Sequence, residues 1–439
     1  MNTSATTAGE RPATPRFYVK GLRWWIAVLL TGVTVVNYLD RTCLSITAPV
    51  FKTQLHINEV EYSRIVVAFQ IAYMLMQPVS GRFIDWINLR KGVAISIFWW
   101  SMAQMLTAFA GTPLGFASFR ALLGIGEAGN FPAGAKTVSE WFRPHERTIA
   151  TGIFNMGSGF GGMIAPFLVT SLLMTYGWQA AFVVTGVIGV VWVGLWLLVY
   201  RSPAEHPWLS PKERAYIEEE KGEIVVQDTP SGTGVWKVVL LQKNFWALAI
   251  ARFLSEPAWQ FFTYWIPLYL ATERHMSIKS IQWFAWAPFL AGDFGSLFGG
   301  VLSPIFIKLR CSVLTARKLS TTVCALLMMF AIFIGSAPTA VWAIVFFCIA
   351  AFAHQAMSAT LLTLPADLFP KRTVATANGL SGSFGQFGGM LFTLVVGYVA
   401  LNVGYAPLFV AIAFFDFIGS MVLWALLREG PRQTATNAA

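Results

Sequence analysis

Apolar runs of 20 or more residues recur along the whole chain, and they constrain its fold more than any other feature of the sequence. The hydrocarbon core of a bilayer is about 30 Å thick, so a helix needs about 20 mostly apolar residues to cross it. The runs do not alternate strictly, and most exceed the roughly 10 residues of a barrel strand, so we expect helices. Twelve segments can be placed, at about residues 24–49, 62–83, 92–111, 114–138, 147–172, 178–200, 245–271, 280–307, 317–337, 339–366, 374–400 and 404–427.

Composition supports a membrane protein rather than a soluble one. The chain has 439 residues, of which 56% are hydrophobic and only 12% are charged, whereas about 25% of the residues of an average soluble protein are charged. The net charge of +10 would suggest a nucleic-acid partner in a soluble protein. Here the basic residues lie in short loops, so we expect a lipid bilayer as partner and no nucleic acid. The four cysteines lack metal-ligand spacing, and we expect neither disulfides nor a metal site.

One long polar segment divides the twelve apolar segments into six plus six. Its prolines, its acidic cluster at 218–220 and its Ser/Gly/Thr stretch near 229–234 predict a mobile, partly helical crossover. Two six-helix halves joined in this way are typical of transporters that bind their substrate near the bilayer midplane. We therefore expect an all-α integral membrane protein, with twelve transmembrane helices in two pseudo-symmetric six-helix bundles. The expected parts are an N-terminal tail (1–23), a first bundle (24–200), the linker (201–243), a second bundle (244–427) and a C-terminal tail (428–439).

Lysine and arginine are distributed unevenly between the two sides of the expected membrane. Most of them fall in the two tails, the linker and one set of loops, whereas the opposite loops hold little beyond Lys52, Arg274 and Lys279. In membrane proteins the cytoplasmic loops carry the excess of basic residues. We therefore expect both termini and the linker in the cytoplasm. The first apolar run is too long for a signal-peptide core, so we expect it to be retained as a span.

An acid and a base stand side by side inside the first apolar segment, at Asp40 and Arg41. Each charge at such a depth costs roughly 2.5–3.5 kcal/mol even on a lenient scale, so charged residues there usually face a partner or a water-filled cavity. A second acid and base, Glu127 and Arg120, lie seven residues apart in the fourth segment and share one helix face. We expect Asp40 and Arg41 to face a central transport pathway.

The chemistry of these four residues suggests a division of roles. Arg41 keeps its charge at any accessible pH and can hold a carboxylate through two hydrogen bonds, so we expect it to bind an anionic substrate. A fixed salt bridge from Arg41 to Asp40 or to another acid is the alternative. Adjacent side chains diverge around a helix, so Asp40 and Arg41 need not pair. Glu127 can exchange a proton, with a static pair to Arg120 as the alternative.

The loop after the second apolar segment resembles the signature of the major facilitator superfamily. Gly81, Asp85 and the paired bases Arg90 and Lys91 match that signature, whereas Asn88 stands where the second glycine is usual. The corresponding loop of the second half is degenerate. Asp85 can accept hydrogen bonds from a helix N-terminus in one conformation and release them in another, which would make this a conformational loop. A charged loop that only sets the topology is the alternative.

Several further stretches resemble the anion:cation symporter family within that superfamily, and in particular its hexuronate transporters. Residues 38–41, 120–132 and 140–147 carry the resemblance, and residues 20–24, 72–78, 251–259 and 353–358 support it. The resemblance implies alternating access, with proton-coupled uptake of a sugar-acid anion, galacturonate or glucuronate, through the inner membrane of a bacterium. It implies protons as the coupling ion and no cofactor. It also implies that Asp40 takes up a proton, with Glu127 as a second proton site.

Other polar and aromatic residues inside the apolar segments are candidates for contacts with a sugar acid, because a dry cavity penalises hydroxyls without hydrogen-bond partners. Packing, or a partner within the protein, is the alternative for each; the pair at 252 and 256 could satisfy itself. Intramembrane acids at 293 and 416 are expected to hydrogen-bond between helices. Besides Arg41 and Arg120, the expected substrate contacts are Tyr38, Tyr73, Ser158, Arg252, Glu256, Trp259, His354, Gln355 and Ser358, with Asn378, Ser381 and Ser383 as weaker candidates.

Other classes of function have less support. The sequence lacks a Walker A pattern and an HExxH motif, and no nucleophile–base set is evident, so we expect neither ATP-driven transport nor enzyme activity. A galactonate or glucarate carrier of the same family, or a sensor that binds sugar acids without moving them, are the alternatives. Moving an anion into a cell that is negative inside costs about 2.3 kcal/mol per charge per 100 mV, which co-transported protons would offset. We expect a monomeric symporter whose first half couples protons and whose second half selects the sugar acid.

Overall fold

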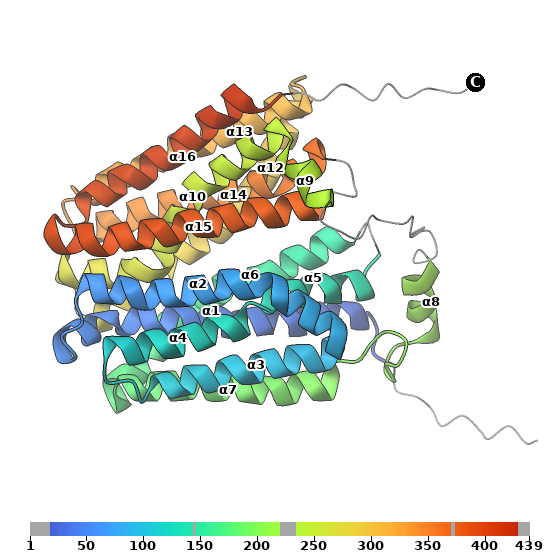
Figure 1. Ribbon diagram of the computed structural model, residues 1–439, viewed down its shortest axis with the longest axis horizontal. Helices are drawn as coiled ribbons and strands as arrows, with labels where there is room; N and C mark the ends of the chain where they lie inside the picture. Colours follow the sequence, from blue (N-terminus) through green and yellow to red (C-terminus); the bar gives the residue numbers. More distant parts are fainter. Residues whose placement is uncertain (1–17, 144–145, 220–233, 370–373, 429–439) are drawn as a thin grey trace, which may run out of the picture.

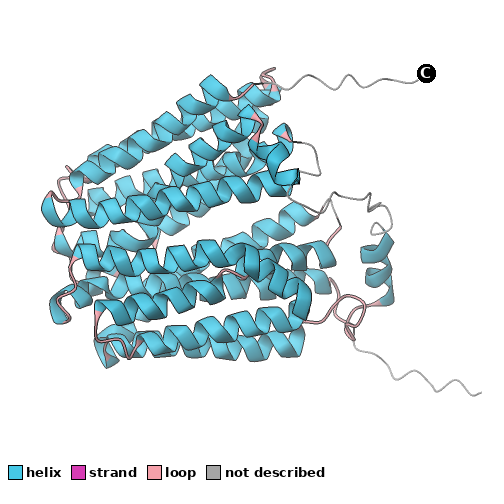
Figure 2. Cartoon of the chain, in the orientation of Figure 1, coloured by secondary structure: helices cyan, strands magenta, loops and turns pink. Residues whose placement is uncertain are grey.

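The computed structural model describes residues 18–143, 146–219, 234–369 and 374–428, which Figure 1 shows as a bundle of long helices. Every regular element within these ranges is helical, as the colours of Figure 2 make plain. At a few helical positions, Asp85 among them, the side chain lies outside the described part. The all-helical fold class expected from the sequence is confirmed.

In the part of the first half that the structure describes, seven helices make six passes through the bundle. The fourth pass is broken, because the amide of Ala128 bonds back to the carbonyls of Gly124 and Gly126 and a new helix begins at Asn130. Glycine lowers the cost of leaving helical geometry. The span expected at 114–138 is therefore two helices. The seven helices are α1 (Leu22–Gln54), α2 (Glu59–Ile87), α3 (Leu89–Thr107), α4 (Pro113–Glu127), α5 (Asn130–Trp141), α6 (Arg147–Tyr176) and α7 (Trp178–Val199).

The second half repeats this plan with different interruptions. The short helix α11 (Ile278–Ile281) and a turn precede the eighth pass, and the ninth pass ends in a 3-10 helix, η2 (Met329–Ile334). The six passes are formed by α10 (Lys243–Thr272), α12 (Ala287–Lys308), α13 (Val313–Met328) with η2, α14 (Ala340–Leu368), α15 (Val374–Asn402) and α16 (Ala406–Leu426).

Eight of the described helical segments are long and apolar enough to cross a membrane by length and composition alone. These are α1, α6, α7, α12, α13 with η2, α14, α15 and α16. The remaining passes, α2, α3, α10 and the broken α4–α5 pair, lie among them and complete the twelve (Figure 1). At the start of α2, for example, Glu59, Glu61 and Arg64 lower the mean hydropathy.

The two halves use the same helix pairs. In the first half α1 packs on α6, α2 on α4, and α3 on α7. The equivalent pairs of the second half are α10 on α15, α12 on α14, and α13 on α16. This correspondence makes the two six-helix bundles pseudo-symmetric, as the sequence predicted.

Glycines bring α6 onto α1 and so fix how α1 is rotated. A Cβ at Gly157 would lie 2.5 Å from the carbonyl oxygen of Thr31, and one at Gly161 would lie 2.7 Å from that of Val35. Small residues at four-residue spacing allow such close approach. With α6 on one side, the middle of α1 presents Asp40 and Arg41 in different directions.

The halves meet along α1 with α10, α2 with α15, and α6 with α12. Hydrogen bonds join them where the Tyr62 hydroxyl donates to the carbonyl of Tyr264, at 2.8 Å, and where the Gln70 amide donates to Gln260, at 3.1 Å. Both bonds lie in the first part of α2 and the last part of α10. That is the end of the bundle farther from the linker helix α8 (Pro211–Glu219) (Figure 1).

The first part of the linker packs against the first half. The carboxylate of Glu213 accepts hydrogen bonds from the backbone N–H groups of Leu22 and Arg23, at 3.3 and 3.4 Å, and so caps the start of α1. The guanidinium of Arg23 bonds to Glu213 at 2.8 Å and to Glu146 at 3.0 Å. Ile217 joins the apolar core beneath α8. Residues 201–219 are therefore a docked element rather than the mobile crossover expected from the sequence.

His206 holds the turn before α8 in place. Its ring is 1% exposed, with Nε2 3.0 Å from the carbonyl of Val199 and Nδ1 3.2 Å from the amide of Trp208. Burial lowers the pKa of His206, so the ring is neutral at neutral pH. Beyond the residues that the structure leaves undescribed at 220–233, helix α9 (Gly234–Leu240) packs on α10 and α15 of the second half.

Candidate functional site

An ion pair in the middle of the first half is the centre of the site. The Nε of Arg41, on α1, lies 2.7 Å from Oε2 of Glu127, the last residue of α4. The Glu127 side chain is fully buried and that of Arg41 is 12% exposed. Glu127 thus pairs with Arg41 and not with Arg120, and of the alternatives for Arg41 the structure has the salt bridge to another acid.

Three aromatic rings surround the Arg41 guanidinium. Its carbon lies 5.2 Å from the ring centre of Tyr38, 5.0 Å from that of Phe69 and 4.7 Å from that of Tyr73. Ring faces attract a cation, and the attraction grows when water is excluded. Glu127 engages Nε, whereas Nη2 is buried and has no hydrogen-bond partner among the described residues. The Nη2 group of Arg41 therefore keeps its capacity to donate hydrogen bonds.

Asp40 points away from this cage, into the interior of the first half. Neither of its carboxyl oxygens is exposed or has a described hydrogen-bond partner by geometry. Thr185 of α7 and Cys43 lie close to it, and the Gln104 amide donates to the Thr185 hydroxyl at 2.8 Å. An isolated buried carboxylate is very unfavourable, whereas the neutral acid is not. Asp40 is therefore suited to holding a proton.

Arg120 lies on the Asp40 side of α1 and not in the cage. Its Nη1 donates to the backbone carbonyl of Asp40 at 3.2 Å, and its guanidinium carbon lies 5.3 Å from the ring centre of Phe182. The side chain is 1% exposed. The structure therefore separates Arg41 from Arg120, with Arg41 toward the second half and Arg120 inside the bundle.

The second half faces the cage with Trp259 and Tyr264 of α10. Trp259 lies beside Tyr38, and Tyr264 is close enough to Arg41 to interact with its charge. The ring of Trp259 stacks on that of His354, with centroids 6.1 Å apart and planes at 11°. His354 therefore lies behind Trp259, as seen from Arg41.

His354 belongs to a buried polar cluster of the second half. Its Nδ1 lies 3.4 Å from Oδ2 of Asp416, on α16, and 3.5 Å from the hydroxyl of Ser255. His354 is 3% exposed and Asp416 is not exposed. The expected helix-to-helix hydrogen bond of Asp416 is therefore present, and it engages Nδ1 of the imidazole.

Arg252 and Glu256, the base and the acid of α10, do not pair with each other. Nη1 of Arg252 donates to the side-chain oxygen of Asn378 at 3.0 Å. Oε1 of Glu256 accepts from the amides of Gln386, at 3.1 Å, and Gln260, at 3.4 Å. The self-paired alternative for Arg252 and Glu256 is thus not what the structure has.

The remaining candidates are spread more widely. The Ser158 hydroxyl donates to the carbonyl of Asn155 in its own helix, at 2.7 Å. Gln355 packs where α14 meets Gly292 of α12, and Ser358 is half-buried. The hydroxyls of the two serines expected in the eleventh span also bond to their own helix, Ser381 to Asn378 and Ser383 to Gly379. The carboxylate of Asp293 packs against Gly159 across the two halves.

The loop between α2 and α3 turns at Asn88. This residue has a φ of +96° and a ψ of 138°, a backbone conformation that favours glycine, which explains why a glycine is usual there. The Asn88 side chain caps α3 by accepting from the amide of Arg90 at 3.0 Å, and the Arg90 guanidinium donates to the carbonyl of Leu197. Gly81 packs near Pro132 of α5 and Lys91 is exposed. The Asp85 side chain lies outside the described residues.

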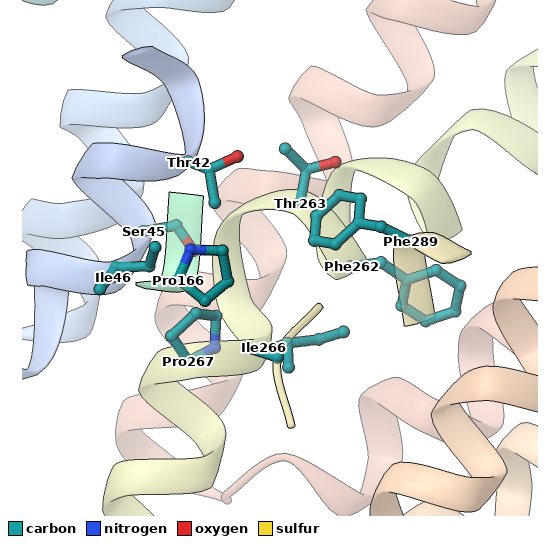
Figure 3. A pocket seen from close by; sticks show the side chains of 10 residues that line it. Thr42, Ser45, Ile46, Pro166, Phe262, Thr263, Ile266, Pro267 and Phe289 are labelled. Atoms are coloured by element: carbon teal, nitrogen blue, oxygen red, sulfur yellow. The ribbon is translucent and has the colours of Figure 1, made fainter. Parts of the chain in front are cut away.

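A small pocket lies between the halves (Figure 3). Its α1 residues follow Arg41 in the chain, so the pocket lies on the side of Arg41 away from the start of α1, where the linker docks. Thr42 and Ser45 of α1 line it together with Thr263 of α10 and Phe289 of α12. It has room for about one water molecule, too little for a sugar.

Sequence reasoning missed the neutral polar residues of the site. Gln70, Gln260 and Gln386 form hydrogen bonds between helices, and Gln104 and Thr185 lie beside Asp40. A single amide or hydroxyl in an apolar run costs much less than a charge, so it carries little signal by itself. Their spacing along one helix face, as for Glu256 and Gln260, is the signal that could have found them.

Comparisons with known proteins agree with this arrangement. The family described as Major Facilitator Superfamily matches residues 30–392. The hexuronate transporter of Escherichia coli is 39% identical over 414 residues, which cover 94% of this chain and 96% of that protein. The galacturonate transporter of Dickeya chrysanthemi is 39% identical over 313 residues, covering 71% and 90%. A probable galactarate/D-glucarate transporter of Bacillus subtilis is 30% identical over 413 residues, covering 91% and 89%.

Solved structures share the fold. A bacterial homolog of the human lysosomal transporter Spinster, in an inward-facing and unoccupied conformation, superposes with a TM-score of 0.73 at 19% sequence identity. The match covers 94% of this chain and 100% of that chain. The similarity therefore extends over both six-helix halves.

Proposed function

This chain belongs to the major facilitator superfamily, and on that basis we propose that it imports a hexuronate anion, galacturonate or glucuronate, together with protons. Its fold and its relatives are those of transporters and not of enzymes. The observation that carries the proposal is the buried Arg41–Glu127 pair inside its aromatic cage. The names of the hexuronate and galacturonate transporters, each 39% identical, support the choice of substrate.

The substrate carboxylate binds the Nη end of Arg41. A guanidinium holds a carboxylate through two parallel hydrogen bonds. The hydroxyls of Tyr38 and Tyr73 and the indole of Trp259 border the same space and offer hydrogen bonds and a ring face to the sugar. Arg252 bonds to Asn378 and Arg120 bonds to the backbone of Asp40, so the Nη end of Arg41 is left for one carboxylate once Glu127 is protonated. This favours a monocarboxylate such as a hexuronate over a dicarboxylic aldarate.

Glu127 couples substrate binding to protons because it competes for Arg41. While Glu127 is ionised, it neutralises the guanidinium and repels a second anion. A proton on Glu127 removes its charge and leaves Arg41 as an uncompensated buried cation, which is costly. The substrate carboxylate then supplies the missing charge. The order that follows is proton first and anion second.

Asp40 is the second proton site. It is fully buried without a described hydrogen-bond partner, so it is most stable as the neutral acid while its environment stays dry. Water that reaches it in another conformation would allow it to ionise. Two protons with one monovalent anion carry a net positive charge inward, so the membrane potential, worth about 2.3 kcal/mol per charge per 100 mV, drives uptake.

Alternating access would move the two halves, residues 24–200 and 244–427, about the site. The halves touch at Gly159 and Asp293, whereas Asn155, one turn nearer the linker on the same face of α6, is exposed. The distribution of basic residues puts the linker and both termini in the cytoplasm. We therefore assign this conformation as open toward the cytoplasm, in a monomer of a bacterial inner membrane.

Uptake of labelled galacturonate into proteoliposomes tests the proposal. An imposed inward proton gradient should accelerate uptake and raise accumulation, and unlabelled glucuronate should compete. No stimulation by the gradient would overturn proton coupling. Stronger competition by galactonate or glucarate than by glucuronate would favour an aldonate or aldarate carrier instead. Binding without any uptake would favour a sugar-acid sensor.

A further inference from the structure

A chain of side-chain amides crosses between the two halves beside the site. It starts at Glu256 and Gln260 of α10, includes Gln386 of α15, and reaches Gln70 of α2. Gln260 is 8% exposed and Gln70 is 4% exposed. A buried amide group that loses its partner pays its full desolvation penalty, so the directions of these hydrogen bonds matter.

Glu256 fixes the direction of the Gln260 amide. An ionised carboxylate only accepts hydrogen bonds, so the NH₂ group of Gln260 must face it, and that group lies 3.4 Å from Oε1 of Glu256. The NH₂ group of Gln386 faces the same oxygen at 3.1 Å, which turns the carbonyl oxygen of Gln386 toward Gln260. That oxygen accepts from the NH₂ group of Gln260 at 3.2 Å, so Glu256 orients the Gln260 amide both directly and through Gln386. The carbonyl oxygen of Gln260 is thereby turned toward the first half.

Thr393 fixes the direction of the Gln70 amide. The Thr393 hydroxyl donates to the carbonyl of Gly389, at 2.9 Å, so it can only accept from Gln70. The NH₂ group of Gln70 lies 3.4 Å from that hydroxyl and 3.1 Å from the carbonyl oxygen of Gln260. Donor therefore meets acceptor across the halves, because Thr393 orients one amide and Glu256 the other.

We propose that Glu256 is a positioning residue for the outer gate, which keeps the halves together on the side away from the linker by orienting Gln260 toward Gln70. This inference rests on the proposed function and extends it to gating. Without the carboxylate, Gln260 can also turn its NH₂ group toward that of Gln70, and two donors then face each other. Tyr62 with Tyr264 holds the same side of the interface and is not oriented by Glu256.

Thiol labelling in a background without the four native cysteines tests the proposal. Ser45→Cys reports opening of the outer side, because Ser45 is buried and lines the pocket between the halves there. Asn155→Cys reports the side facing the linker, where Asn155 is exposed. Each reporter is combined with Gln260→Leu or Glu256→Gln, and a membrane-impermeant thiol reagent is applied from the matching side without substrate or proton gradient.

We expect Gln260→Leu and Glu256→Gln each to raise the rate of Ser45→Cys labelling by about threefold to tenfold, the factor that corresponds to one lost hydrogen bond. Labelling of Asn155→Cys should not rise. Gln179→Leu, at an exposed glutamine outside the chain of amides, is the matched control and should change neither rate.

Three results would overturn the inference. Unchanged Ser45→Cys labelling in both variants would mean that the amides do not hold the gate. An increase with Gln260→Leu but not with Glu256→Gln would remove the positioning role of Glu256. A rise at both reporters would indicate general loosening. The labelling assay needs no substrate, so its outcome does not depend on whether the protein transports a hexuronate. A failure of hexuronate uptake would overturn the proposed function without deciding whether Glu256 positions the gate.

Discussion

In the first half, Arg41 meets an acid at 2.7 Å inside a cage of three aromatic rings, whereas in the second half Arg252 donates to the neutral side chain of Asn378. The acids differ in the same way. Glu127 opposes a cation, whereas Glu256 is held by two amides. A neutral amide partner stabilises a charged side chain, and the amide itself does not gain or lose a proton. We therefore expect the first half to respond to protonation and the second half to hold its charges constant.

The deeper acids extend this comparison. Asp40 has no described hydrogen-bond partner, whereas Asp416 lies 3.4 Å from the imidazole of His354. The carboxyl group of Asp416 is thus held by a hydrogen bond between helices, whereas that of Asp40 is not. The two halves thus have similar helix packing but different chemistry. The predictions that follow test whether coupling really belongs to the first half.

The largest difference should come from the two deep acids. Asp40→Asn removes an ionisable group that we place in the coupling cycle, so accumulation driven by a proton gradient should be lost, while exchange of labelled for unlabelled substrate persists. Asp416→Asn should reduce accumulation by less than about threefold, since it costs about one hydrogen bond. Proteoliposome uptake with and without the gradient measures both. Equal losses in the two variants would end the distinction between the halves.

Substitutions of Arg41 and Arg252 should differ almost as strongly in their effect on uptake. Arg41→Lys replaces a planar fork by a point charge, which loses the second hydrogen bond to a carboxylate. We expect KM for galacturonate to rise about 10- to 100-fold, as for the loss of a charge-assisted bond of about 1.5–3 kcal/mol. Arg252→Lys should raise KM by about threefold or less. Initial uptake rates over a range of substrate concentrations give the comparison, and a larger effect at Arg252 would reverse the assignment.

Glu127→Gln should uncouple affinity from pH. The amide of the variant resembles the protonated acid and does not compete for Arg41, so the affinity for substrate should stay high as pH rises. In the unaltered protein the affinity should fall as pH rises, because ionised Glu127 competes for Arg41. Substrate binding measured at low and high pH checks this. Glu256→Gln is the matched change in the second half and should preserve the pH dependence. A pH-independent affinity in the unaltered protein would contradict the competition.

A smaller effect is expected on selectivity. Trp259 faces the site and stacks on His354, so His354→Asn should disturb the indole without removing a group that touches the substrate. We expect the ratio of galacturonate to glucuronate affinity to change by about threefold, within the range that one weakened contact gives, with proton coupling unaffected. Competition assays at one pH provide the ratio. Loss of proton coupling in this variant would show that the second half also carries protons.

Ser158→Ala should have the smallest effect, less than about twofold on KM. The Ser158 hydroxyl already donates to a carbonyl of its own helix, so its removal should have little effect on either stability or substrate binding. The same uptake assay applies. An increase of KM of tenfold or more would place Ser158 in the substrate site, as its position in the sequence had suggested.

Much of the fold could be predicted because its signal is local. The length of each apolar run is enough to predict one membrane-spanning helix. The excess of lysine and arginine in one set of loops can likewise be counted without knowing how the helices pack. The exception is the fourth span, where the glycines that signalled close packing also break the helix at Ala128. The linker is another exception, because the partners of Glu213 at the start of α1 lie about 190 residues away.

The site was predictable in its members but not in their pairing. Asp40, Arg41 and Glu127 stood out because charges in apolar segments are costly. Which acid would meet Arg41 depended on how α1 is rotated and at what depth α4 ends. The sequence did not show that the imidazole of His354 would stack on Trp259 and hydrogen-bond to Asp416.

The sequence by itself determined the number of spans, the two halves and the positions of the intramembrane charges, because hydrophobic length and the cost of a charge are properties of single segments. Only the tertiary structure decided the partners. Arg41 joins Glu127 across 86 residues, and Glu256 joins Gln386 across 130. Helix packing decides these pairs, because residues so far apart in the chain meet only where their helices lie side by side.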